Sequence, residues 1–483
     1  MKNQKKTLTS VSLLFGMLFS SCQSYITPPM AVHKSVYTQL KPEEKELFPS
    51  DISELTLEDA QALALENNPD FLSIRFSIDS ARARYYQSFS SYAPTLNAGM
   101  SISQSFSKMY MSENTSKTRN QSESYRPSLS GNWLIFDCLA REMNILSTRY
   151  ELKQAISARD DAKRLLLRAV AYAYNAILLD ITQISIAQAE IDYAKKMLAE
   201  AQNKYDAGTG LLTDVLNFKI SLHQGELNKI KTQHSLESDK YVLAGYLGIT
   251  DGTIPENVTF PEIQAKDIIL ANVEIYLDEA LQNRPDLRQI REGLKAAKYS
   301  YWKSFSAFGP TVSANFELGY GTNHNVPKSG GNTWTGTGSF SYGLNANWNL
   351  FNGFSDYMTM KAALANLAKQ DYTLAKTWID VVTDVRTSYD NCINYMEQEK
   401  VTKTILDLTK QTRDMVENEY LAGTALVTRL NEAERDLLSA SNNLALATIN
   451  TSNAKAQLEA SIAALSNSLP VGPYRKEQAT TTP

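Results

Sequence analysis

The sequence predicts a mainly α-helical chain that carries four β-strands and arose by duplication of one domain-sized unit. Four landmarks recur about 215 positions apart, and four segments alternate apolar and polar residues over about ten positions or more. Two further stretches of about 67 residues contain no proline and follow a helical pattern. Period-two alternation is typical of strands with one apolar face. Helices of that length are typical of coiled coils.

The duplication is visible in four pairs of matching segments. The segment around Pro69 recurs around Pro285, a shift of 216 positions. A period near 215 residues is too long for a solenoid, so we predict two repeats, 56–250 and 273–467, joined by a linker at 251–272. The other pairs are Ala93–Leu96 with Gly309–Val312, Trp133–Asp137 with Trp348–Asn352, and Tyr205–Thr209 with Tyr420–Thr424.

Each repeat is predicted to contain the same elements in the same order. A short helix and a second helix precede two strands, and a long helix, a glycine turn and a last helix follow. A helix of about 67 residues is about 100 Å long and must pack along its whole length. We expect helices at 56–68, 70–92, 139–205 and 211–247, and again at 273–283, 286–308, 354–420 and 426–465. We expect strands at about 95–107, 124–136, 311–321 and 336–351.

The predicted strands suit a membrane. They are long enough for a tilted outer-membrane span, one face is apolar, and the other is rich in Ser and Asn. Trp133 and Trp348 lie near strand ends, where an aromatic membrane girdle is expected. The polar segments Lys108–Glu123 and Thr322–Trp334 are expected to form outer loops. The alternative is a soluble β-sandwich with its apolar face inward.

Four strands cannot close a membrane barrel alone. An open sheet edge is not tolerated in lipid, so closure needs further copies of the chain. Two chains would supply eight strands and three would supply twelve, and only the larger barrel leaves room for a water channel. The most apolar later stretch, Ala169–Ile191, contains Asp180 and Glu190. We therefore expect strands, and no helix, to cross the membrane.

The N-terminus is predicted to be an export signal. A start with three lysines precedes a short apolar stretch that ends at Phe19, too short to span a bilayer. Two serines then precede Cys22, a pattern similar to a bacterial lipobox. We predict a signal peptide over 1–21, acylation of Cys22 and a lipidated extended segment over 22–55. A plain signal peptide with an incidental cysteine is the alternative. Residues 468–483 are expected to form an irregular tail.

Composition and charge exclude several classes of function. The chain of 483 residues has 48 Lys and Arg against 52 Asp and Glu, a net charge of −4, so we expect no nucleic-acid partner. Its four histidines form no HExxH motif, and neither a GxSxG motif nor a phosphate-binding glycine loop occurs. Cys138 and Cys392 lack the spacing of metal ligands. The sequence therefore predicts no enzyme, no cofactor and no metal site.

These features together resemble the outer-membrane factor family typified by TolC and OprM. The lipobox, the duplicated helix–hairpin–helix unit and the paired strands after Pro-Thr carry the resemblance, which covers about Thr56 to Ser466. It implies a homotrimer with a twelve-stranded barrel in the outer-membrane lipid and a periplasmic tunnel of twelve helices. It also implies a periplasmic adaptor and an inner-membrane pump of the RND or ABC type as partners, with substrates conducted passively to the cell exterior.

The resemblance implies that the two glycine turns form the periplasmic tip that meets the adaptor. Glycine is also a common left-handed helix cap, so an ordinary turn between two helices is the alternative. The implied tip residues are Gly208, Thr209, Leu211, Leu212 and Thr213 at the first turn, and Gly423, Thr424, Leu426 and Thr428 at the second.

A pore gate is implied next to these turns. Asp214 and Tyr420 match positions that hold the family's entrance closed, and Glu432 matches an acidic position in the constriction. An acid in the first turn of a helix, favoured by the helix dipole, is the alternative for Asp214. The chain departs from the TolC pattern at Ala425, where a basic residue is usual, and at Arg429, where an aspartate is usual.

Our hypothesis for the gate follows from these departures. Arg429 would pair with Asp214 or Glu432 across helices, and Arg429→Ala would raise the channel leak, whereas an unchanged leak would contradict the hypothesis. Two other functions stay open at this point. One is an outer-membrane component of type I protein secretion, and the other is a non-channel periplasmic coiled-coil scaffold lipoprotein. The lipobox favours efflux of drugs or other small molecules.

Overall fold

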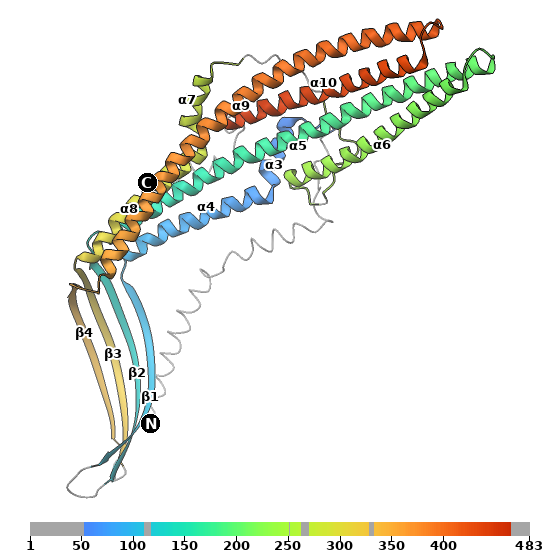
Figure 1. Cartoon of the computed structure of the whole chain (residues 1–483). Helices are drawn as coiled ribbons and strands as arrows, with labels where there is room; N and C mark the ends of the chain where they lie inside the picture. The colour runs from blue at the N-terminus through green and yellow to red at the C-terminus, as the bar shows by residue number, and fades with distance from the viewer. Residues whose placement is uncertain (1–52, 111–116, 251, 262–269, 328–332, 465–483) are drawn as a thin grey trace. The chain divides into compact units, whose positions relative to one another are not determined.

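The structure is a computed structural model that describes residues 53–110, 117–250, 252–261, 270–327 and 333–464. The predicted signal peptide, Cys22, most of the extended segment and the tail lie outside these residues. The described chain is mainly helical with one sheet (Figure 1), so the predicted fold class is confirmed. Its helices are α3 (Leu57–Asn67), α4 (Pro69–Ser88), α5 (Ala140–Asp206), α6 (Leu212–Leu247), α7 (Val273–Asn283), α8 (Pro285–Ser304), α9 (Ser355–Leu421) and α10 (Val427–Ser461), with short 3-10 helices η1 (Phe89–Tyr92) and η2 (Phe305–Phe308).

The chain folds into two compact units that do not coincide with the two sequence repeats. Of the residues that the structure describes, unit 1 contains those within Met1–Asn68, Ala169–Ala265 and Ile405–Ile449, and unit 2 contains the others. Unit 1 therefore includes α3, α6, the second part of α5, the end of α9 and most of α10. Unit 2 includes α4, the sheet, α7, α8 and the rest of α5 and α9. Each unit combines segments from both repeats.

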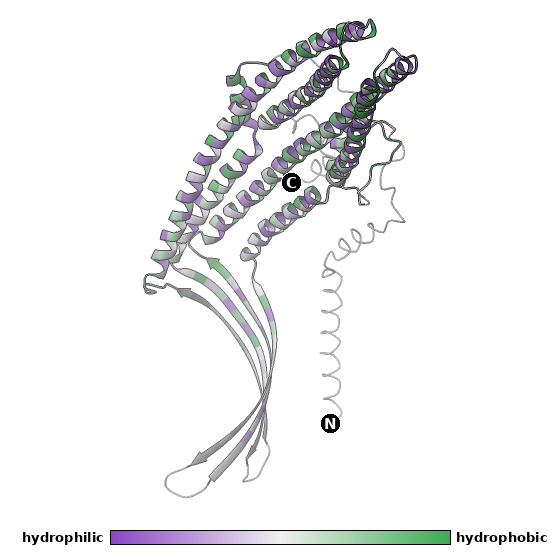
Figure 2. Cartoon of the chain, turned by 45° about the vertical axis from the view of Figure 1, so that its right-hand side comes forward, coloured by the Kyte–Doolittle hydropathy of each residue, from purple (hydrophilic) through white to green (hydrophobic). Residues whose placement is uncertain are grey.

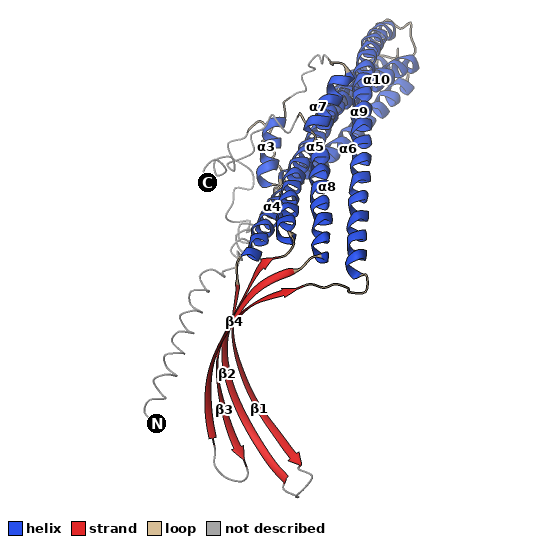
Figure 3. Cartoon of the chain, turned by 90° about the vertical axis from the view of Figure 1, so that its left-hand side faces the viewer, coloured by secondary structure: helices blue, strands red, loops and turns tan. Residues whose placement is uncertain are grey.

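The sheet in unit 2 has four strands in sequence order, all antiparallel (Figure 3). The backbone ladder between β2 and β3 is interrupted at Arg126 and Pro127, and its register shifts between Leu134 and Phe136 near the end of the second strand. The first and last strands each have one unpaired edge in the chain. The strands are β1 (Thr95–Tyr110), β2 (Lys117–Phe136), β3 (Thr311–Pro327) and β4 (Thr333–Asn347).

All four strands extend further toward the outer loops than the sequence pattern predicts, and β4 begins at Thr333 where 336 was expected. β1 continues to Tyr110, β2 begins at Lys117 and β3 continues to Pro327, so parts of the expected loops Lys108–Glu123 and Thr322–Trp334 are strand. The alternation of apolar and polar residues reports which side chains meet an apolar environment, whereas backbone pairing continues without it. At its other end β4 stops at Asn347, before Trp348.

One face of the sheet is apolar and exposed in the single chain. Bands of hydrophobic and hydrophilic residues follow one another along the strands near the helices (Figure 2). Gly131 has a packing role on this face, because a Cβ atom there would lie 2.2 Å from the Phe316 ring. The exposed apolar side chains of the two edge strands are Leu96, Met100, Ile102 and Phe106 on β1, and Phe340, Tyr342 and Leu344 on β4.

A buried arginine organises unit 2. The Arg284 side chain is 6% exposed and forms ion pairs with Asp286 at 2.7 Å and with Asp384 of α9 at 2.6 Å. It also donates a hydrogen bond to the carbonyl of Ser461 at the end of α10. The Arg284 guanidinium lowers the pKa of Asp286. One cation thus joins the start of α8 to α9 and α10.

The linker between the repeats contributes to unit 1. The amide of Leu55 donates a hydrogen bond to the carbonyl of Thr259, and the amide of Thr259 donates one to the carbonyl of Ser53. The hydroxyl of Tyr174 on α5 donates a hydrogen bond to the carbonyl of Leu55 at 2.9 Å, and its ring contacts that of Phe260. The segment before the first repeat and the linker are therefore fixed to the same helix.

One helix in the described chain, α5, is long and apolar enough in part to cross a membrane by length and composition alone. This differs from our expectation that no later stretch would qualify. Half of that stretch is buried within the structure, as in the core helix of a folded protein. Its polar residues are consistent with packing against other helices: Asp180 is buried, and Glu190 is half-buried.

Candidate functional site

The two turns between the long helices have the same hydrogen bonds. In the first, Gly208 has a φ of 75°, and the amides of Thr209 and Gly210 donate to the carbonyl of Lys204. In the second, Gly423 has a φ of 80°, and the next two amides donate to the carbonyl of Glu419. A left-handed residue at the end of a helix favours glycine, which has no Cβ penalty.

The threonines after these glycines complete both turns. The hydroxyls of Thr209 and Thr424 donate to the carbonyls of Lys204 and Glu419 at 3.1 and 3.0 Å. Sequence reasoning missed Gly210, where a Cβ atom would lie 2.8 Å from a backbone nitrogen. The matching residue of the second turn is Ala425, whose amide contact to Glu419 is longer, 3.2 Å against 2.8 Å. The offset of 215 between Gly210 and Ala425 could have revealed this asymmetry.

Both turns expose leucines whose side chains pack little against the rest of the chain. Leu211 is 66% exposed and Leu426 is 75% exposed. Leu211 also occupies the position before α6 where a polar side chain usually caps the helix, and it makes no such cap. Leu212, Thr213 and Thr428 are exposed beside them. An apolar side chain in place of a cap, displayed in solvent, is typical of a contact surface.

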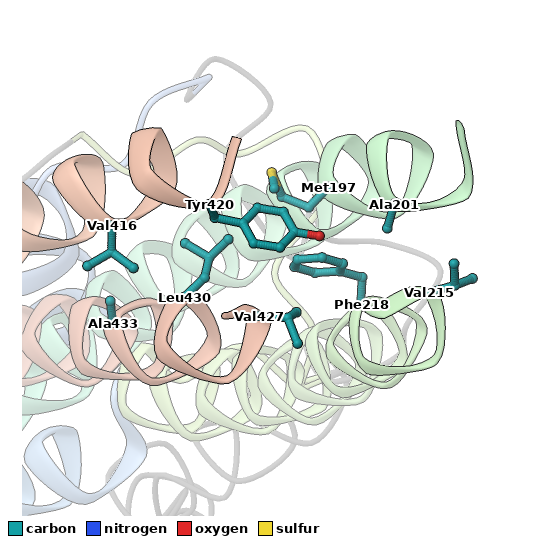
Figure 4. Packing of buried hydrophobic residues seen from close by; sticks show 9 residues of the cluster. All are labelled: Met197, Ala201, Val215, Phe218, Val416, Tyr420, Val427, Leu430 and Ala433. Atoms are coloured by element: carbon teal, nitrogen blue, oxygen red, sulfur yellow. The ribbon is translucent and has the colours of Figure 1, made fainter. Parts of the chain in front are cut away.

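A hydrophobic cluster lies directly behind the turns in unit 1 (Figure 4). It joins α5, α6, α9 and α10, so both hairpins contribute. Its centre is the contact of Tyr420 with Phe218, whose rings meet edge to face at 5.9 Å. The buried members are Met197, Ala201, Val215, Phe218, Val416, Tyr420, Val427, Leu430 and Ala433.

Asp214 and Tyr420, two of the predicted gate residues, come together in this cluster. The Tyr420 side chain lies close enough to the Asp214 carboxyl group for the two to interact electrostatically. Burial, and then the negative charge of Asp214, raise the pKa of Tyr420 to about 12. The ammonium of Lys204 lies over the Tyr420 ring at 4.8 Å. Tyr420 therefore links the second long helix to the start of α6.

Arg429 has a different partner from the ones we expected. Its Nη1 lies 3.5 Å from the carboxylate of Glu419, and both side chains are largely exposed. A single chain therefore does not show the expected pairing of Arg429 with Asp214 or Glu432, which stays a prediction for the assembled gate. Glu419 lies at the end of α9 and Arg429 at the start of α10, so the turn between these two helices brings the two side chains together. Glu432 is exposed on α10.

The predicted girdle tryptophans occupy matching places at the junction of sheet and helices in unit 2. Trp133 Nε1 donates to the carbonyl of Tyr92 at 2.9 Å, and Trp348 Nε1 donates to the carbonyl of Phe308 at 3.0 Å. Both rings are about half exposed. An aromatic ring with an apolar body and a satisfied polar tip is typical of a membrane interface.

The strand-to-helix turn at this junction is also duplicated. Cys138 and Leu139 have positive φ angles of 53° and 68°, as do Gly353 and Phe354 with 68° and 65°. Arg141, which follows the first turn, is 9% exposed and donates to the carbonyls of Leu134 and Ile135. Both turns thus connect a strand to a long helix through two consecutive left-handed residues, and only one of the four is glycine.

No group of three or more metal-ligating side chains occurs among the residues that the structure describes. Cys138 donates to the carbonyl of Pro310 at 3.3 Å, and Cys392 is buried. The predicted lipidation of Cys22 lies outside the described residues.

Two long helical hairpins attached to a four-stranded sheet with an exposed apolar face define a class of outer-membrane protein. The chain belongs to the outer membrane efflux protein family, whose family model matches residues 61–248 and, a second time, residues 276–464. The two matches correspond to the duplication seen in the sequence. The resemblance to the outer-membrane factor family, inferred from the sequence, is confirmed.

The chain is similar to several known proteins of this class. It is 23% identical over 405 residues to the alkaline protease secretion protein AprF of Pseudomonas aeruginosa, covering 83% of each chain. It is 23% identical over 433 residues to the outer membrane protein TolC of Escherichia coli, covering 86% of each.

Solved structures show the same fold. The outer-membrane channel OprN has a TM-score of 0.71 at 18% identity, with 84% of this chain and 89% of that chain covered. The CmeC outer membrane channel of Campylobacter jejuni has a TM-score of 0.73 at 16% identity, with 88% and 89% covered.

Proposed function

We propose that three copies of this chain form an outer-membrane channel with a periplasmic helical tunnel, which conducts substrates delivered by an adaptor and an inner-membrane pump. The observation that carries this proposal is the four-stranded sheet. Its apolar face is exposed, and β1 and β4 each have an unpaired edge. In lipid these edges must pair, and β1 of one copy can pair with β4 of the next. Three copies give a twelve-stranded barrel, wide enough for water.

Apolar stripes on the helices of unit 1 support assembly. On α6 the exposed apolar residues Leu216, Ile220, Leu227 and Ile230 recur at intervals of three, four and seven. On α9, Ile405, Leu408 and Met415 do the same. Spacing of this kind is typical of a seam between helices. Since the chain itself leaves both stripes in solvent, they are suited to contacts with neighbouring copies.

The exposed turns support a docking role. Leu211, Leu212 and Leu426 display apolar side chains on rigid, hydrogen-bonded turns, which is suited to the tip of a helical hairpin from an adaptor. Thr209 and Thr424 fix the backbone beneath them. We assign adaptor contact to these residues, with Gly208 and Gly423 as the conformational requirement, and the closed gate to Tyr420 with Asp214. Thr213 and Thr428 complete the surface.

Protein secretion is the second candidate. The relative AprF is by name a secretion protein for alkaline protease, and the chain covers 83% of its length. The class of pump and the exported substrate distinguish this function from efflux of small molecules. Both functions use the same channel. We also propose acylation of Cys22 as a further anchor in the outer membrane.

Native mass spectrometry in detergent, followed by planar-bilayer recording, tests the proposal. Protein extracted from outer membranes should have the mass of three chains without the predicted signal peptide 1–21, plus any attached lipid; the uncleaved chain is 53.9 kDa. Added to a lipid bilayer, it should produce discrete conductance steps. A monomer or dimer that needs no detergent and gives no conductance would contradict the channel and leave a periplasmic scaffold. A Cys22→Ala variant shows separately whether the lipid mass depends on that residue.

A further inference from the structure

A second cluster of charged side chains lies in unit 1, behind the hydrophobic cluster and apart from the Asp214–Tyr420 pair. Its centre is Arg413 on α9, which is 20% exposed. Arg413 Nη1 lies 2.7 Å from Glu417 on the same helix, and Arg413 Nε lies 3.4 Å from Glu434 on α10. Its guanidinium also lies over the ring of Tyr193 on α5 at 5.0 Å. One side chain of the second hairpin therefore contacts the first.

A second contact between the hairpins joins the same cluster. Lys196 of α5 pairs with Glu417 at 3.1 Å. We call the set Tyr193, Lys196, Arg413, Glu417 and Glu434 the brace. It is built from α5, α9 and α10, and Phe218 and Ser221 of α6 line the cavity that adjoins it.

The brace and the charged groups around it together contain more acid than base. Among its half-buried groups, the Arg413 cation faces the carboxyl groups of Glu417 and Glu434, and Glu190 of α5 lines the same cavity as Glu434. Asp414 on α9 adds a further, more exposed acid. Arg435 on α10 lines the cavity, and Lys196 is 63% exposed, so water screens much of its charge. The buried carboxyl groups are therefore not all neutralised.

The geometry around Glu434 fits a neutral carboxyl group. Its Oε2 is inaccessible and makes no hydrogen bond, and the same holds for Arg413 Nε, which lies 3.4 Å away. Tyr193 Oη and Glu190 Oε2 on the facing helix are buried as well and have no hydrogen-bond partner among the described residues. The cavity between them has a volume of about 40 Å³, enough for water. An ionised carboxylate in this place would lack the hydrogen bonds that a buried charge requires.

We propose that the brace holds the two hairpins together when the channel entrance is closed, and that loss of a proton from Glu434 releases it. This inference rests on the proposed channel function. The hairpins must part for a substrate to enter, and Arg413 and Glu417 lie where α9 meets α5. Glu434 is the member whose protonation is favoured by packing of the helices.

The direction of the pH effect follows from burial. Burial, and then Glu417 and Glu190, raise the pKa of Glu434 to about 7, against the lowering effect of Arg413. In separated, hydrated hairpins this pKa returns to its usual value near 4.5. The stabilisation of the packed state is therefore complete below that value and is lost as pH rises through about 7. We expect the entrance to be held more firmly at pH 5 than at pH 8.

Planar-bilayer conductance of the full-length assembly at pH 5, 6, 7 and 8 tests the brace. The open fraction of wild-type channels should rise with pH. Each unit of difference between the Glu434 pKa of the packed and the separated hairpins can change the ratio of open to closed channels by at most about tenfold. Glu434→Gln, which stays neutral, should keep the entrance closed across this range. Asp436→Asn is the matched control, because it removes an exposed charge from the same helix and should leave the wild-type profile. Arg413→Met should conduct at every pH.

A wild-type profile without pH dependence, or an unchanged slope in Glu434→Gln, would overturn the inference. Hydrogen exchange of wild-type protein in detergent provides a readout that needs no variant. Amides of α5 near Tyr193 and of α10 near Glu434 should exchange faster at pH 8 than at pH 5 after correction for intrinsic rates. Equal corrected rates would also contradict the brace. If no sample conducts, the channel proposal fails, and hydrogen exchange still decides whether the brace responds to protons.

Discussion

Arg284 is the residue on which the packing of unit 2 depends most directly. Its replacement by methionine keeps an unbranched apolar stem but leaves Asp286, Asp384 and the Ser461 carbonyl without their cation. Breaking a buried ion pair on one side costs about 3 kcal/mol or more. We expect Arg284→Met to lower the thermal midpoint of the assembly in detergent, followed by circular dichroism.

Arg288, on the next turn of α8, provides the control for this prediction. Its side chain is exposed and donates to the Asn283 carbonyl. Arg288→Met should change stability by only about 0.5 kcal/mol. Equal effects of the two substitutions would show that Arg284 has no special role in unit 2.

Cys138 and Gly309 form a second pair that depends on single atoms. A Cβ atom at Gly309 would lie 2.1 Å from the Cys138 sulfur, and Cys138 itself has the positive φ that glycine tolerates best. Gly309→Ala should therefore destabilise the wild-type protein by about 1–3 kcal/mol through overpacking. In a Cys138→Gly background the same substitution should cost much less.

The matching position of the second repeat is Gly353, so Cys138→Gly introduces the residue that the second repeat already has at this left-handed position. Stability of the four proteins in a double-mutant cycle, measured by thermal melting, gives the coupling between the two positions. Additive effects would show that the sulfur and the added methyl group do not compete for the same space.

At this scale the sequence predicted some residues and not others. Gly208 and Gly423 were identified because a glycine at the end of a helical pattern has a local cause. Arg413 and Glu434 were missed because their significance comes from contacts between segments that are distant in the sequence. The contact of Arg429 with Glu419 within one chain was not predicted for a similar reason, since the sequence shows which charges exist but not which of them meet.

At the scale of elements, the same substitution should affect folding very differently on the two faces of the sheet. Leu344 is exposed on the apolar face of β4, and Ser341 belongs to the polar face. A lysine on the lipid side of an outer-membrane strand costs about 2–4 kcal/mol near the bilayer centre, and far less on the lumen side. Leu344→Lys should therefore reduce the amount of folded protein in outer membranes, whereas Ser341→Lys should not.

The amount of heat-modifiable protein on semi-native gels of outer membranes measures this difference. The sandwich alternative predicts that Leu344→Lys disrupts a soluble core and leaves the protein in the periplasm in a soluble, misfolded form. Equal yields for both variants would contradict a lipid-facing β4. Apolar alternation predicted these faces correctly, whereas the strand ends at Tyr110, Lys117 and Pro327 lie where the alternation no longer reports burial.

At the scale of the whole molecule, closure of the sheet between copies can be tested with paired cysteines. Ser101 on β1 and Ser341 on β4 are each six residues from the end of the ladder near the helices. Within one chain two further strands separate them, about 14 Å at the usual strand spacing, so an internal disulfide is impossible. Ser101→Cys combined with Ser341→Cys should give oxidised dimers and trimers.

Each single-cysteine variant serves as a control for background cross-linking through the native cysteines. Only monomers after oxidation of the double variant would contradict pairing of β1 with β4 of another copy. Shifting one cysteine by two positions, to Ser103 on the same face of β1, tests an adjacent register. A reducing gel should return every product to the monomer.

The sequence showed the two repeats clearly, but it could not show the two compact units. Repeats are defined by similarity along the chain, whereas the units depend on which helices pack together. Unit 1 takes the end of α9 from one repeat and α6 from the other. The brace and the hydrophobic cluster behind the turns lie where such segments meet, and this explains why sequence reasoning found the turns but not what holds them.

The unequal turns of the two repeats have a consequence for symmetry. In the proposed assembly of three, six hairpins surround one axis. They form two sets of three, and the threefold rotation relates only hairpins of the same set. Gly210 in one turn and Ala425 in the other show that the two kinds of hairpin have already diverged. In a ring of six identical hairpins, any substitution at the tip would appear in all six. Because this chain carries two, alternate hairpins can specialise, one set for a partner and the other for the lumen.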